Sequence, residues 1–153
     1  MSEHTLVAPR SGGLLFETAS AQFSGITASI LMGGDDVPFT VMELTVESGM
    51  GAPAHISFHE DKIFHVSQGR FLFLVAEARI EVGPGAHVFV DKGQVHSFAA
   101  LDGVARMTLV SSPAHHDRFF LELSALPVPH DQAQVEAVCR DCDQQIVGPV
   151  IGT

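Results

Sequence analysis

Two short segments, 53–69 and 85–96, place histidines on strand-like stretches, and they constrain the fold more than any other feature of the sequence. They read PAHISFHEDKIFHVSQG and GAHVFVDKGQVH. Side chains along a strand alternate between its two faces, so each segment presents one-sided rows of residues. His55, Lys62 and His96 belong to three such rows. Three strands can aim these residues at one point only if the sheet curls into a barrel.

Short strand-like runs at regular spacing surround the two segments. They cover Leu14–Glu17, Ile26–Leu31, Phe39–Val46, Arg70–Ala76, Arg79–Val82, Ala86–Val90, Val95–Ala99 and Ala105–Ser111. Gly69, Gly85 and Gly93 stand where a hairpin needs positive φ or a close backbone approach. This pattern predicts an all-β sandwich or barrel. After Pro113 the spacing of apolar residues becomes that of two short helices.

The two segments resemble the two signature motifs of the cupin superfamily. The first motif, G-x5-H-x-H-x3,4-E-x6-G, has its histidines, glutamate and closing glycine on His55, Ser57, Lys62 and Gly69. The second motif, G-x5-P-x-G-x2-H-x3-N, falls on Gly85, Asp91, Gly93, His96 and Ala100. Two of the four metal ligands of the family, His55 and His96, are therefore present. Ser57 and Lys62 stand in place of the other two.

The resemblance covers the chain from about residue 24 to its C-terminus and implies a fold. The tail, with Ser112-Pro113 followed by 117–122 and 147–149, is similar to the C-terminal extension of quercetin-dioxygenase-like cupins. The resemblance implies a double-stranded β-helix, or jelly-roll barrel, with a short helical C-terminal tail. It divides a single domain into an N-terminal arm with the first strand (1–23), the barrel (24–112) and a helical extension packed on the barrel (113–153).

The resemblance also implies a pocket inside the barrel, and two functions for it are open. Its lining is expected to include His55, Ser57, Lys62, Phe64, His96 and Phe98. In the first function the pocket binds a small anionic or enolic molecule, with weak or no metal binding. In the second the chain is a metal-dependent oxidoreductase similar to quercetin 2,3-dioxygenase. A divalent Fe, Mn, Ni or Zn ion would then lie on His55, His96 and a substitute ligand, for which His59 is the candidate. An enzyme of this fold would be dioxygenase-like or isomerase-like.

The direction of Lys62 distinguishes these functions. An unpaired ammonium inside the barrel costs several kcal/mol or loses its proton, whereas a side chain that reaches the barrel mouth keeps its charge in water. An inward ammonium would repel a dication and attract an anion. Lys62 is also the candidate catalytic residue, because an amine with a lowered pKa is a nucleophile that can form a Schiff base with a carbonyl ligand.

Four polar residues near these positions are predicted to take no part in the pocket. Glu60 and Asp61 match loop residues of the cupins that the chain resembles, and we expect both in solvent. His115 and His116 begin the first predicted helix, and we expect them on its polar face.

The charge and composition of the chain limit the kinds of partner that it is expected to bind. The net charge is −10 and the chain has only eight Lys and Arg residues, which argues against nucleic acid and anionic membranes as partners. With no apolar run of about 18 residues, we expect a cytoplasmic protein. Apolar residues at 14–16, with Ile26 and Ile30, predict a homodimer. Cys139 and Cys142 lack the second ligand pair of a zinc site, so we expect reduced thiols.

Overall fold

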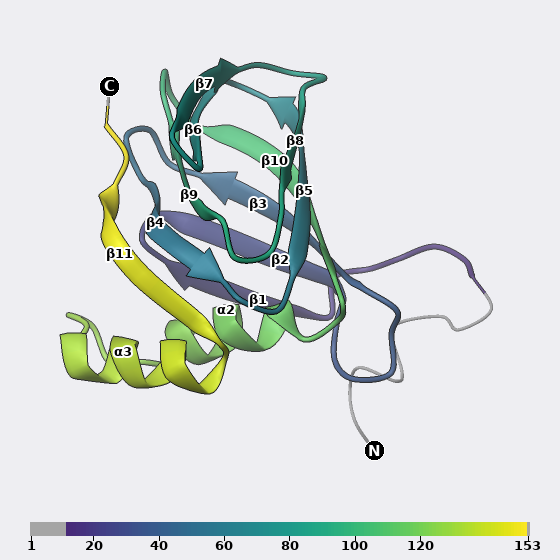
Figure 1. Cartoon of the computed structure of the whole chain (residues 1–153). Coiled ribbons are helices and arrows are strands. Elements are labelled where there is room, and N and C mark those ends of the chain that lie inside the picture. Colours follow the sequence, from purple (N-terminus) through teal and green to yellow (C-terminus); the bar gives the residue numbers. More distant parts are fainter. Residues whose placement is uncertain (1–11, 153) are drawn as a thin grey trace.

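The computed structural model describes residues 12–152, which form two antiparallel β-sheets facing each other and two short helices at one end of the barrel (Figure 1). The six-stranded sheet has the order β1-β2-β3-β10-β5-β8, and the five-stranded sheet has the order β11-β4-β9-β6-β7. The strands are β1 (Ala19–Phe23), β2 (Ile26–Met32), β3 (Thr40–Val46), β4 (Gly51–Ser57), β5 (Asp61–Gln68), β6 (Phe71–Val75), β7 (Ala78–Val82), β8 (His87–Val90), β9 (Val95–Ala100), β10 (Ala105–Ser112) and β11 (Gln144–Val150).

The core lies between the two sheets. Along β3 and β10 buried residues alternate with more exposed ones, as expected for strands with one face toward the core. The largest fully buried apolar side chains come from both sheets and are Phe64, Phe71, Phe73, Ile26, Ile30, Met42, Leu44, Met107 and Leu109. The prediction of an all-β barrel is thereby confirmed.

Seven of the eight predicted strand runs are strands, and the first is not. Residues 14–17 form no strand; the first strand of the described chain is β1, which pairs with β2. Leu14 and Phe16 are 75% and 63% exposed, so their apolar character does not mark a core strand. The predicted apolar surface at Ile26 and Ile30 is also wrong, because both side chains are buried.

The two predicted helices are α2 (His116–Ser124) and α3 (Gln132–Asp141). Helix α2 packs on β1 and α3 packs on β11, so the helices close one end of the barrel (Figure 1). The segment 113–153 also contains a strand that the sequence pattern did not predict. Strand β11 pairs with β4 at the edge of the five-stranded sheet, and Gly148 and Pro149 within it hide its strand character.

Glycines allow two features of the fold: the tight turns between strands and the close approach of β4 to β9. The three predicted turn glycines, Gly69, Gly85 and Gly93, have positive φ of 74°, 93° and 85°. A Cβ at Gly51 would lie 1.9 Å from the carbonyl oxygen of Phe98, so only glycine allows β4 to approach β9 this closely.

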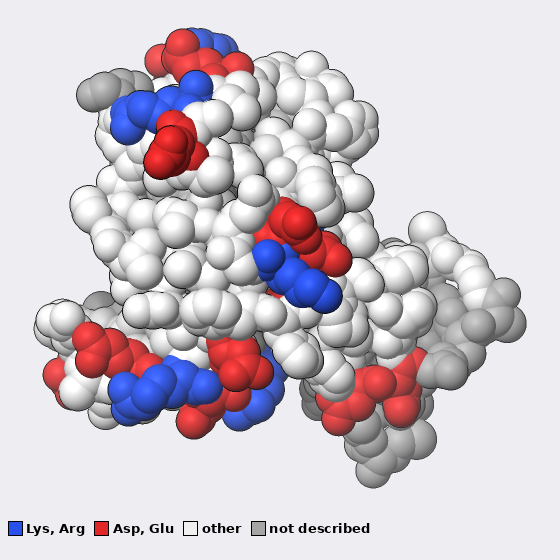
Figure 2. All heavy atoms as spheres, viewed as in Figure 1, with Lys and Arg blue, Asp and Glu red and all other residues white. Residues whose placement is uncertain are grey.

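Charged side chains of both signs lie next to one another on the face seen in Figure 2, most densely over the two helices. Arg118 and Glu122 form an ion pair within α2. This face shows no extended area of Lys and Arg alone. In the part of the chain that the structure describes, no helix is long and apolar enough to cross a membrane.

Candidate functional site

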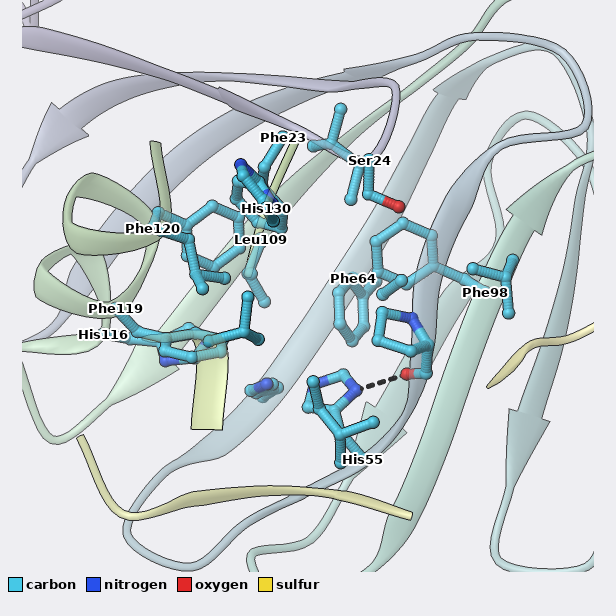
Figure 3. Close-up of a pocket in the computed structure, with 18 residues that line it drawn as sticks. Phe23, Ser24, His55, Phe64, Phe98, Leu109, His116, Phe119, Phe120 and His130 are labelled. Atoms are coloured by element: carbon cyan, nitrogen blue, oxygen red, sulfur yellow. Dashed lines mark hydrogen bonds between the residues drawn. The ribbon is translucent and has the colours of Figure 1, made fainter. Parts of the chain in front are cut away.

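A cavity of about 180 Å³ lies inside the barrel at the end covered by the helices. It is lined by Phe23, Ser24, Ile26, Ala52, Pro53, His55, Lys62, Phe64, Phe98, Leu109, His116, Phe119, Phe120, Leu123, His130, Val135, Ile146 and Val150. Among these, Ser24, His130 and Ile146 are exposed. Figure 3 shows Phe23 and Ser24 toward one end, His55 and His116 toward the other, and Phe64 and Phe98 beside the space between. The cavity therefore has an apolar body and a polar inner end.

Neighbouring strands bring His55 and His96 together. They are direct register partners on β4 and β9, and their ring centroids are 4.1 Å apart. Nδ1 of His55 lies 2.7 Å from the carbonyl oxygen of Pro53, and Nδ1 of His96 lies 3.0 Å from that of Gln94. A carbonyl oxygen can only accept, so each Nδ1 carries the hydrogen. The Nε2 atom of each neutral ring is then an acceptor.

Lys62 points into the barrel. On β5 it alternates with the exposed Ile63, and its side chain is only 2% exposed. Its Nζ lies 3.0 Å from Nε2 of His96 and donates a hydrogen bond to it. Of the two directions considered for Lys62, toward the barrel interior or toward the barrel mouth, the structure shows the first. Among the described residues, no other Lys or Arg side chain is buried.

Burial determines the charges of this group. Loss of hydration lowers the pKa of Lys62 to about 7, against an opposing effect of the Glu60 carboxylate. Burial and then the charge of Lys62 lower the pKa of His55 to about 3. The same two causes lower the pKa of His96. Both imidazoles are therefore neutral near pH 7, and Lys62 is the one group of the three that changes charge there.

A buried hydrogen-bond chain lies beside Lys62. The Ser57 hydroxyl donates to Oε1 of Gln144 at 2.6 Å, and Nε2 of Gln144 donates to Oε1 of Glu60 at 3.0 Å. Burial raises the pKa of Glu60, while the charge of Lys62 opposes this rise. Ser57 is thus held by β11 and does not line the cavity.

His116 completes the polar inner end from the helix side. Its ring is 2% exposed and lines the cavity, and burial places its pKa well below the usual range. Nδ1 of His116 is 3.6 Å from Oε1 of Glu60 and has no hydrogen-bond partner.

The structure brings together most of the predicted site residues. His55, Lys62, Phe64 and Phe98 line the cavity, and His96 is hydrogen-bonded to Lys62 behind this lining. His59, the candidate third metal ligand, is exposed and lies in a separate outer cleft with Glu60 and Asp143. The structure therefore does not place His59 with His55 and His96.

Two predictions of solvent exposure are wrong, because Glu60 is 5% exposed and His116 is 2% exposed. The position of His116 had a signal in the sequence. With Phe119, Phe120 and Leu123 it follows the spacing i, i+3, i+4, i+7 of one helix face, and that face is the buried one. The burial of Glu60 had no such signal, since it depends on Gln144 from a strand that the sequence did not reveal.

The two cysteines stand apart from this cavity. Both are free thiols, Cys139 buried and Cys142 partly buried. Burial raises the pKa of both, to about 11 for Cys142. Thiols with raised pKa are poor nucleophiles and poor metal ligands.

The residues around His55 and His96 do not fit a divalent metal. Metal sites of this kind use several deprotonated or neutral donors, commonly with a carboxylate. Here Nε2 of His96 accepts from the Lys62 ammonium, and the Ser57 hydroxyl is bound to Gln144. Within residues 12–152, no three His, Cys, Asp or Glu side chains are grouped so that they could hold a metal ion.

No protein-family model matches the sequence, and neither does any curated protein. Solved structures do match. KdgF from Halomonas sp. superposes with a TM-score of 0.62 at 19% identity, over 70% of this chain and 98% of that one. Pac13 from Streptomyces, described as a nucleoside dehydratase, gives 0.60 at 17% identity over 92% and 94%. An RmlC-like cupin from Shewanella frigidimarina gives 0.56 at 16% identity over 73% and 94%.

These likenesses concern the fold, since each identity is low. They agree with the two facing sheets described above. The chain therefore has the all-β cupin fold with a short helical segment near its C-terminus.

Proposed function

We propose that this protein is a metal-independent cupin that binds a small molecule with an anionic or enolic head and an apolar body. The observation that carries the proposal is the Lys62 ammonium, buried at the polar end of the cavity and hydrogen-bonded to His96 where a cupin of the family would hold its metal.

The charges of the cavity residues indicate the chemistry of the ligand's head. Near pH 7 the inner end of the cavity presents Lys62, which can be cationic, beside the neutral imidazole of His55. Glu60, the nearest acid, lines the outer cleft and not the cavity. A carboxylate or enolate beside Nζ would restore the ionic partner that the buried ammonium lacks on its cavity side.

The side chains that line the cavity indicate the chemistry of the ligand's body. Phenylalanines from three strands and helix α2 line the cavity, together with Leu109, Leu123 and Ile26. Such walls favour an aromatic or alicyclic group over a sugar or a free amino acid. Pac13, a nucleoside dehydratase by description, has the same fold, which supports a small-molecule role for the cavity here.

The metal-dependent alternative, an oxidoreductase similar to quercetin 2,3-dioxygenase, is disfavoured by the same geometry. A dication on His96 would have to displace the Lys62 hydrogen bond and lie beside an ammonium. Two neutral imidazoles give it neither the ligand number nor the negative charge that such ions require.

Calorimetric titration with benzoate and trans-cinnamate, and with benzyl alcohol as the uncharged counterpart, tests the proposal. We expect the two carboxylates to bind in preference to the alcohol. Lys62→Met should weaken carboxylate binding by about tenfold or more, since it removes a desolvated charge partner. Lys92→Met, at the other lysine of the chain, is exposed and should leave affinity unchanged. Carboxylate affinity that is equal in both variants, or absent from the unmodified protein, would contradict the proposal.

A further inference from the structure

Lys62 and His96 have the geometry of a nucleophile and its base. In such sites the base lies within hydrogen-bond reach of the nucleophile and is oriented in turn by a third group. Nζ of Lys62 is 3.0 Å from Nε2 of His96. The ring of His96 is held by its Nδ1 hydrogen bond to the carbonyl oxygen of Gln94. Lys62 is also part of the cavity lining, together with His55 and Phe64.

We propose that the cavity captures aldehydes or ketones with an apolar body by forming a Schiff base on Nζ of Lys62. The inference rests on the proposed function, since it places the head of the ligand at the same nitrogen. It adds a covalent step that anion binding does not need.

The step balances without a cofactor. The lone pair of the neutral Nζ attacks the carbonyl carbon, a C–N bond forms, and the C=O π electrons move to oxygen. His96 Nε2 accepts one proton from Nζ and returns it to that oxygen, which gives a carbinolamine. The second Nζ proton follows the same route, the C–O bond breaks, and one water leaves the C=N product. The two hydrogens of the amine and the oxygen of the carbonyl account for that water.

The surroundings favour this chemistry. Phe64, Phe98 and Phe119 give the cavity apolar walls, and a site with little water slows the hydrolysis of an imine.

Reductive trapping tests the proposal on the unmodified protein. The protein is incubated with benzaldehyde and sodium cyanoborohydride at about pH 8, and benzylated peptides are quantified by mass spectrometry. The chain has two lysines, so the exposed Lys92 is an internal reference in every molecule. Because Nζ of Lys62 lies 3.0 Å from an imidazole acceptor, we expect benzylation of Lys62 to exceed that of Lys92 by at least about tenfold.

Benzoate, which competes for the cavity, should suppress benzylation at Lys62 and leave Lys92 unchanged. Lys62→Arg, which keeps a cation but not the amine, should remove the adduct and retain carboxylate binding. Benzylation of Lys62 no greater than that of Lys92, or unaffected by benzoate, would overturn the covalent step. If benzoate binds through Lys62 in calorimetry while no Lys62 adduct forms, only this inference fails. If benzoate binding also fails, the proposed function fails with it.

Discussion

Nζ of Lys62 and Nε2 of His96 are 3.0 Å apart inside the barrel, and this contact uses the imidazole nitrogen that a metal would need. Because Nδ1 of His96 donates to Gln94, Nε2 is the only acceptor of the ring. A lysine and a dication therefore compete for one atom. The low metal content expected of this protein follows from that competition.

Metal content should be low. We expect well under one equivalent of transition metal after purification and dialysis, because two neutral imidazoles and an ammonium form a poor site. Restoring the ligand types of the family with Ser57→His and Lys62→Glu together should raise the content toward one equivalent. Elemental analysis of the purified proteins measures this. Each single variant is a control that leaves the ligand set incomplete, and stoichiometric iron, manganese, nickel or zinc in the unmodified protein would contradict the account.

Lys62→Met should stabilise the protein below pH 7 and lose this effect as the pH rises. The pKa of Lys62 falls from 10.5 to about 7 on folding, so between these values the unfolded chain binds more protons and stability rises with pH. Below pH 7 the buried ammonium costs several kcal/mol, on the order of 3 to 5. Loss of the hydrogen bond to His96 offsets part of the gain.

Urea unfolding at about pH 6 and about pH 10 measures the free energy of unfolding of this variant. We expect a gain of about 2 kcal/mol at the lower pH and none at the higher, by the linkage above. Lys92→Met, at an exposed lysine, should change the value by less than about 0.5 kcal/mol at either pH. A stability difference between Lys62→Met and the unmodified protein that does not vary with pH would argue against a buried ammonium.

Buried histidines should make the protein sensitive to acid. Burial lowers the pKa of His55 to about 3 and also lowers those of His96 and His116. The unfolded chain therefore takes up protons that the folded chain does not as the pH falls below about 6.5, and stability is lost by up to about 1.4 kcal/mol per pH unit for each histidine. Chemical unfolding between about pH 7 and pH 4 measures this slope.

His55→Gln should reduce the acid slope by about one histidine's share, because it removes one buried ring with a lowered pKa. An unfolding free energy that is flat over this pH range would show that the three rings reach water.

We propose that the protein is a homodimer that pairs through the side of the barrel carrying β1. This strand is the edge of the six-stranded sheet, and the preceding Leu14 and Phe16 are 75% and 63% exposed. Light scattering should give twice the chain mass of 16.3 kDa. Phe16→Glu should shift the mass toward the monomer, whereas Phe89→Glu, on the opposite edge strand β8, should not. A mass near that of one chain at micromolar concentration would refute the dimer.

Most of the barrel followed from the sequence because strand periodicity and turn glycines are local signals. Lys62, Phe64 and Val66 alternate with exposed residues, and all three are buried as that pattern predicts. One edge strand of each sheet was harder to predict. Strand β1 has only five residues, and β11 contains Gly148 and Pro149 and pairs with the distant strand β4.

The site residues on the barrel strands could be predicted from the sequence. Those contributed by the C-terminal tail could not. The spacing of the two segments indicated that His55, Lys62 and His96 converge. Two residues lie next to Glu60: Gln144 and His116. Both come from the last 40 or so residues, so their placement depends on how the tail folds back onto the barrel. Only the helical spacing of His116 with the phenylalanines of α2 gave a local signal.

The titration of Lys62 tests the central claim most directly. With lysine labelled with ¹³C at Cε, the protein gives two lysine signals by NMR, which Lys92→Arg assigns. The account predicts that the Lys62 signal titrates with a pKa of about 7 and that benzoate raises this value, because a bound anion stabilises the ammonium. A Lys62 signal with an ordinary lysine pKa of about 10.4 and no response to benzoate would contradict it.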